Sequence, residues 1–120
     1  MSEAEVLEML NLHAANAMNG FAIYLTLTFA FLTAIYIVGV QLSKLQAVLI
    51  SALYFAWSTS FSLVAITHLR DIDSLVSEYP DFINTRMWHI PWTAFGCLIT
   101  IAGILICCGF AYDIRREKKL

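Results

Sequence analysis

Residues 45–69 read LQAVLISALYFAWSTSFSLVAITHL and contain no Asp, Glu, Lys or Arg. Two other stretches, residues 9–43 and 87–112, also lack these charges, so the three charge-free stretches hold 35, 25 and 26 residues in chain order. A helix needs about 20 apolar residues to cross the roughly 30 Å hydrocarbon core of a bilayer. Each stretch is therefore long enough to form a membrane-spanning helix.

The composition agrees with this pattern. The 120 residues are 60% hydrophobic and 13% charged, whereas soluble domains average about 45–50% apolar and about 25% charged residues. A chain this short cannot enclose so large an apolar excess in its own core. We therefore predict an all-α integral membrane protein with a single membrane domain over residues 1–120, and we exclude a soluble enzyme.

The polar residues between the stretches set the limits of three predicted spans. These spans are residues 19–40, 47–67 and 91–111, followed by a basic tail at 112–120. Only residues 41–46 join the first two spans, and so short a connection makes them antiparallel neighbours. Pro91 suits the first position of the third helix, where its missing N–H costs nothing.

Residues 1–18 precede the first span and are too polar for hydrocarbon. Ser2 and Glu5 have the spacing of a capping box, and apolar residues then recur at helical intervals. We expect a short amphipathic helix at the membrane interface. The alternative is that the first span starts early as one long helix, because Asn19-Gly20 is only a moderate break signal.

Residues 68–90 form a long segment between the second and third spans. An apolar stripe at helical spacing continues from Leu69 to Tyr79, which predicts a helical extension that Pro80 ends. The acidic residues of this segment suggest a cation site or a docking surface, although the solvated face of an interfacial helix is the favoured interpretation.

The charges sort by sign between the two sides of the predicted bundle. Five basic residues share one side: Lys44, Arg115, Arg116, Lys118 and Lys119. The other side has two, Arg70 and Arg86, and seven acids: Glu3, Glu5, Glu8, Asp71, Asp73, Glu78 and Asp81. The positive-inside rule then places the C-terminus in the cytoplasm and the N-terminus outside a plasma or bacterial inner membrane.

Each predicted span has a face of small or hydroxyl-bearing residues, the kind that pack helices together in lipid. The faces are Ala22, Thr26, Ala30 and Thr33; then Ser51, Tyr54, Ser58, Ser62 and Ala65; then Gly96, Thr100, Gly103 and Cys107. The second face has two interpretations. It either packs against the other helices, which is favoured, or lines a pore built from several copies of the chain.

The spans contain no Asp, Glu, Lys, Arg or His near their middles, whereas ion-coupled transporters normally depend on such a residue. No catalytic triad, glycine-rich phosphate loop or dinucleotide pattern occurs in the sequence. We therefore expect neither enzymatic activity nor active transport, and no basic stretch is dense enough for nucleic acid.

The three histidines, His13, His68 and His89, all lie near the predicted outer face. Convergence of their imidazoles would bind a transition metal, and His68 with His89 would suit a haem. Because the three belong to no metal-spacing motif, the favoured interpretation is amphipathic interfacial residues, and no cofactor is expected.

Three functions remain open. The leading one is a non-enzymatic membrane protein that self-associates or joins a larger membrane complex, with the lipid bilayer as its surroundings. The second is a homo-oligomeric pore lined by the second span. The third is a metal- or haem-binding membrane subunit.

Overall fold

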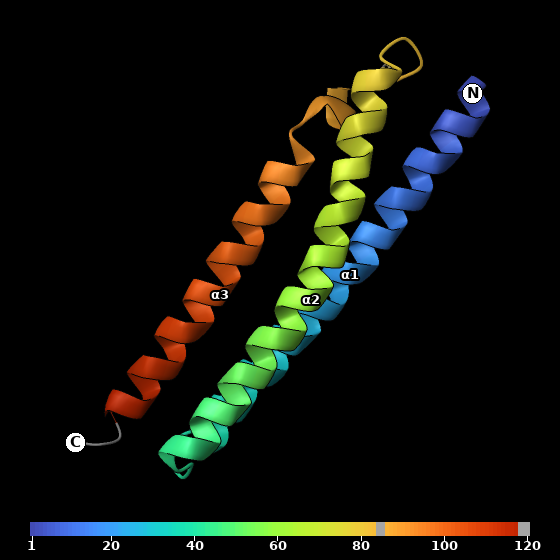
Figure 1. Ribbon diagram of the computed structural model, residues 1–120. Coiled ribbons are helices and arrows are strands. Elements are labelled where there is room, and N and C mark those ends of the chain that lie inside the picture. The colour runs from blue at the N-terminus through green and yellow to red at the C-terminus, as the bar shows by residue number, and fades with distance from the viewer. Residues whose placement is uncertain (84–85, 118–120) are drawn as a thin grey trace.

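A computed structural model shows an all-helical chain with one short connecting helix (Figure 1). Its elements are α1 (Glu3–Val38), α2 (Lys44–Glu78), the 3-10 helix η1 (Arg86–His89) and α3 (Trp92–Glu117). The structure describes residues 1–83 and 86–117, with the side chains of residues 86 and 87 left aside. The described chain is a rod of 62 × 18 × 17 Å.

The three long helices are each apolar and long enough to cross a membrane, as the sequence predicts. α1 and α2 lie side by side and antiparallel, and α3 returns along them, so the N-terminus and the α2–α3 connection share one end (Figure 1). We call this the acidic end. The α1–α2 turn and the last turn of α3 form the other end, which we call the basic end.

The first turn of α1 is closed by the predicted capping box. Glu5 N–H donates to Ser2 Oγ (3.3 Å), and Ser2 N–H donates to Glu5 Oε2 (2.7 Å). The bond from the Ser2 backbone lowers the pKa of Glu5. Because the folded-state pKa is the lower one, this stabilisation is present at neutral pH and is lost as the pH falls through that pKa.

α1 continues through Asn19 and Gly20 without interruption. Of the two alternatives for residues 1–18, the structure therefore has the single long helix and no separate short one. Its 36 residues span about 54 Å, well beyond the roughly 30 Å of hydrocarbon.

α2 begins with a second capping box, which was not among the predictions. Gln46 N–H donates to Ser43 Oγ (3.2 Å), and Ser43 N–H donates to Gln46 Oε1 (2.9 Å). The S-x-x-Q spacing is a readable signal for this start. The helix then runs as one piece to Glu78, two residues before Pro80.

The start of α3 is capped from outside by a side chain of α2. The Asp73 carboxylate accepts hydrogen bonds from the backbone N–H groups of Trp92 (3.2 Å) and Thr93 (2.9 Å) and from the Thr93 hydroxyl (2.6 Å). A negative charge at a helix N-terminus also complements the helix dipole. Asp73 therefore fixes where α3 joins the other two helices.

We predict that Asp73→Ala destabilises the fold by about 0.5–2 kcal/mol, the usual cost of losing an N-terminal cap. Thermal unfolding in detergent, followed by circular dichroism, would show a lower midpoint. Asp81→Ala is the matched control, because Asp81 is an exposed turn residue. Equal midpoints for the Asp73 variant and the wild type would contradict the role.

Packing inside the bundle changes along its length. An apolar cluster near the acidic end contains Val6, Leu10, Ala17, Leu69, Ile72, Leu75, Val76 and Ile83. A second cluster toward the basic end contains Phe31, Ile35, Tyr54, Cys107 and Ile114. Between them lie the buried hydroxyls of Thr28, Ser58, Ser62 and Thr100. The interior is therefore apolar at both ends and hydrogen-bonded in the middle.

Two glycines let the helices approach closely. A Cβ on Gly20 of α1 would lie 2.9 Å from the Cβ of Ala65 on α2. A Cβ on Gly103 of α3 would overlap the hydroxyl oxygen of Tyr24 on α1. The α1–α2 and α1–α3 contacts thus each depend on a position where a side chain is absent.

We predict that Gly103→Ala destabilises the bundle by about 1–3 kcal/mol, because the added methyl overlaps Tyr24. Gly109→Ala is the control on the same helix, since its Cβ meets nothing within 4 Å, and alanine there gains up to about 1 kcal/mol of helix propensity. Thermal midpoints should therefore move in opposite directions. A rise in both midpoints would show that helix propensity, and not packing, decides the outcome at Gly103.

The predicted packing face of the first span is wrong for contacts within this chain. Ala22, Thr26, Ala30 and Thr33 are all exposed. α1 instead packs through a face that includes Gly20, Tyr24, Thr28, Phe31 and Ile35. The prediction favoured small side chains, whereas α1 uses one glycine for close approach and large side chains to fill the remaining space.

Candidate functional site

The hydroxyl-rich face of α2 is turned into the bundle. Ser58 and Ser62 are 0% and 1% exposed, and Tyr54 is also buried. The Tyr54 hydroxyl lies 3.0 Å from Thr28 Oγ1 and 3.4 Å from Cys107 Sγ, so it contacts both neighbouring helices.

α3 contributes a second set of these bonds. Ser62 Oγ is hydrogen-bonded to Thr100 Oγ1, and Thr100 Oγ1 also contacts the Gly96 carbonyl oxygen (2.9 Å). Because a carbonyl oxygen only accepts, Thr100 donates to Gly96 and accepts from Ser62. Tyr24 OH donates to the backbone carbonyl oxygen of Thr100 (3.0 Å). This bond joins α1 to the same residue of α3.

The structure thus brings together most residues of the predicted packing or pore face. Tyr54, Ser58, Ser62, Gly96 and Thr100 are buried, and Ser51 and Gly103 are half-buried. Within one chain the hydroxyls of Tyr54, Ser58, Ser62 and Thr100 are directed to neighbouring helices or to backbone carbonyls of their own helices. This arrangement is what the packing alternative requires.

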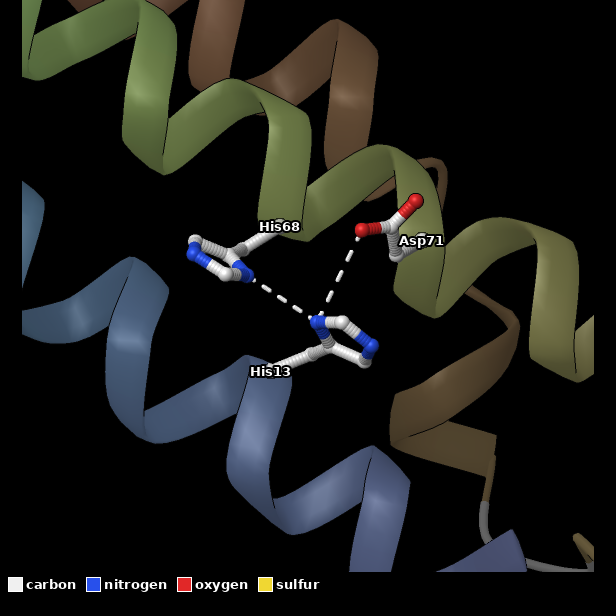
Figure 2. Close-up of side chains that lie close together, drawn as sticks. All are labelled: His13, His68 and Asp71. Atoms are coloured by element: carbon white, nitrogen blue, oxygen red, sulfur yellow. Dashed lines mark hydrogen bonds and ion pairs between the residues drawn. The ribbon is translucent and has the colours of Figure 1, made fainter.

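Near the acidic end, α1 and α2 place two histidines against each other (Figure 2). His13 Nδ1 and His68 Nδ1 are 3.0 Å apart, and the two ring centroids are 5.3 Å apart. The residues are 55 positions apart in sequence, so the antiparallel register of α1 and α2 creates this pair.

Asp71 completes the cluster; it was predicted only as part of an acidic cation site in the segment 68–90 and was not grouped with the histidines. Its Oδ2 lies 3.7 Å from His13 Nδ1, and the three ligand atoms all lie within 4.8 Å of one another. Asp71 follows His68 by three residues on one helix, a spacing that places both on one side. That spacing was available from the sequence.

His89, the third predicted ligand, lies elsewhere. Its Nε2 is 3.1 Å from the carbonyl oxygen of Ile83. Since a carbonyl only accepts, Nε2 carries the proton and donates. Among the described residues, the cluster that could hold a metal comprises His13, His68 and Asp71 and does not include His89.

The charges at the two ends follow from the same topology. Arg115 of α3 donates to the Gly39 carbonyl oxygen (2.8 Å) and the Leu42 carbonyl oxygen (3.3 Å) in the α1–α2 turn. Lys44 begins α2 beside this turn. Lys44, Arg115 and Arg116 therefore lie at this end, whereas Arg70 lies at the acidic end and Lys118 and Lys119 lie outside the described residues.

An apolar groove of about 410 Å³ runs between α1 and α3 toward the acidic end. It is lined by Ala14, Phe21, Tyr24, Trp88, Trp92 and Phe95, among others. The buried indole nitrogen of Trp92 has no hydrogen-bond partner among the described residues. The groove has almost no polar lining, so it presents almost no hydrogen-bonding or charged groups to a ligand.

Comparisons with protein-family models, with curated proteins and with solved structures found no match for this chain.

Proposed function

We propose that this chain is a non-enzymatic multi-pass membrane protein that works by association, either with further copies of itself or within a larger membrane complex. One observation carries the proposal. Trp57 is the central residue of the charge-free stretch 45–69, and its side chain is 53% exposed.

An indole is unfavourable at this position without a partner. Tryptophan is enriched at the two membrane interfaces, where its N–H reaches water or headgroups. In the middle of the hydrocarbon nothing accepts that hydrogen bond, and an unpaired polar group there carries a large penalty. A protein surface that covers Trp57 removes the penalty.

The neighbouring residues extend the same face of α2. Leu53, Trp57, Ser60 and Val64 follow one another at spacings of three and four residues, and all are exposed. Phe61 stacks on Trp57 with ring centroids 6.0 Å apart, which restrains the indole. This face, which we call the Trp57 face, is separate from the buried hydroxyl face of α2.

The pore alternative receives less support from these contacts. A pore wall needs hydroxyls directed to water, whereas Ser58, Ser62 and Tyr54 contact other helices or their own backbone. The interior of the bundle in one chain is occupied by these contacts.

We predict that a photo-crosslinking amino acid at position 57 captures a membrane protein, either a second copy or another chain, in native membranes. Phe29 is the matched control position, since it is 65% exposed on α1 near the level of the Thr28–Tyr54 contact. Products from position 57 that contain only lipid would contradict the proposal. Trp57→Leu should weaken captured association by about threefold to tenfold, the usual range for such bonds in membranes.

We also propose that the basic end faces the cytoplasm of a plasma or bacterial inner membrane, and that the acidic end faces outward. The support is that Lys44, Arg115 and Arg116 lie at one end, whereas seven of the nine acidic residues, all but Asp113 and Glu117, lie at the other.

A membrane-impermeant maleimide tests this orientation in intact cells. Ser2→Cys should be labelled, and Glu117→Cys should be labelled only after the membrane is opened. The native cysteines of the unaltered chain measure the background, because Cys97, Cys107 and Cys108 lie within the charge-free stretch of α3. The reverse pattern would invert the topology.

A further inference from the structure

The acidic end holds an apolar seam of the kind found in water-soluble helix pairs. Val6 and Leu10 of α1 are buried in one cluster with Ile72, Leu75 and Val76 of α2, while Glu3, Glu8, Ser77 and Glu78 are exposed around them. Such a pattern gains free energy only where water surrounds the helices. His13 and His68 lie where this part of the bundle meets the apolar spans.

The two imidazoles face each other through the same nitrogen. Nδ1 of His13 and Nδ1 of His68 are 3.0 Å apart, and two lone pairs at that distance repel unless a proton or a cation lies between them. A zinc ion bonded to two imidazoles at about 2.0–2.1 Å in tetrahedral geometry separates the nitrogens by about 3.3 Å. A movement of a few tenths of an ångström therefore converts the pair into two ligands.

Asp71 supplies a third ligand from the water side. Its carboxylate oxygen is 3.7 Å from His13 Nδ1, and its side chain is 46% exposed, compared with 18% for His13. An ion can thus enter past Asp71, and the acidic residues at this end attract cations. Two imidazoles and one carboxylate form a donor set that suits Zn²⁺, Cu²⁺ or Ni²⁺ and leaves a position for water.

From this geometry we infer that His13, His68 and Asp71 form a binding site for a divalent transition-metal ion that joins α1 to α2. The site goes beyond the proposed association and does not depend on it, because all three ligands belong to one chain. A bound ion that requires both helices in place stabilises the folded bundle by mass action.

The test uses the purified full-length protein in lipid nanodiscs after removal of metal by a chelator. Equilibrium dialysis with Zn²⁺ should give one ion per chain, and Mg²⁺ should not compete, since it prefers oxygen ligands. Added Zn²⁺ should also raise the thermal midpoint of the wild type.

His13→Ala and His68→Ala should each lower the affinity for Zn²⁺ at least tenfold and abolish the shift in midpoint. His89→Ala is the matched control and should bind as the wild type does, because His89 is bonded to Ile83 and lies outside the cluster. His13→Gln guards against loss of fold, since circular dichroism can establish that it remains helical while it lacks the imidazole.

Electron paramagnetic resonance of the Cu²⁺-loaded protein gives an independent measurement. The wild type should show coupling to two imidazole nitrogens, and each histidine variant should show one or none. The inference is overturned if the wild type binds no ion, if His13→Ala and His68→Ala bind unchanged, or if His89→Ala loses affinity equally.

Discussion

In the hydrocarbon core of a membrane the hydrophobic effect, which drives the folding of most soluble proteins, does not bring helices together. Apolar side chains gain nothing by leaving lipid for one another, so helices in a membrane associate through close packing and interhelical hydrogen bonds. This chain meets that constraint with the close approach of Gly20 to Ala65 and a layer of hydroxyls that includes Thr28, Ser62 and Thr100. The rest of the bundle takes its spacing from these contacts.

The helices are longer than the membrane is thick, and this mismatch divides the molecule in two. α1 and α2 have 36 and 35 residues, while about 20 suffice to span. With the basic end, where Arg115 binds the Gly39 and Leu42 carbonyls, at one membrane surface as proposed, the surplus length projects at the other end. At that end the interior is an apolar cluster of the kind found in water-soluble helix pairs. Charged side chains around it can be hydrated, so they carry no large desolvation penalty.

The features that the sequence predicts well are those decided by short-range signals. Charge-free length predicts the three spans, Ser2 with Glu5 predicts the start of α1, and Pro80 predicts the end of α2, which the structure places at Glu78. Asp73 could not be predicted as the cap of α3, because that contact joins residues 19 and 20 positions apart across a turn. The prediction of the inward face of α1 was wrong for a similar reason. Whether a small or a large side chain is buried depends on the side chains of the neighbouring helix, which are distant in sequence.

The histidine cluster shows how one long-range choice determines a site. The spacing of His68 and Asp71 places both on one side of α2, but it says nothing about what lies opposite. The opposing residue is set where Gly20 meets Ala65. His13 precedes Gly20 on α1 by about two turns, and His68 and Asp71 follow Ala65 on α2 by about one to two turns. Because the helices are antiparallel and have the same rise per residue, these positions lie at a similar level. A shift of one turn would carry His13 past His68 and also break the Gly20–Ala65 contact. The packing of the spans and the geometry of the candidate metal site are therefore consequences of a single register.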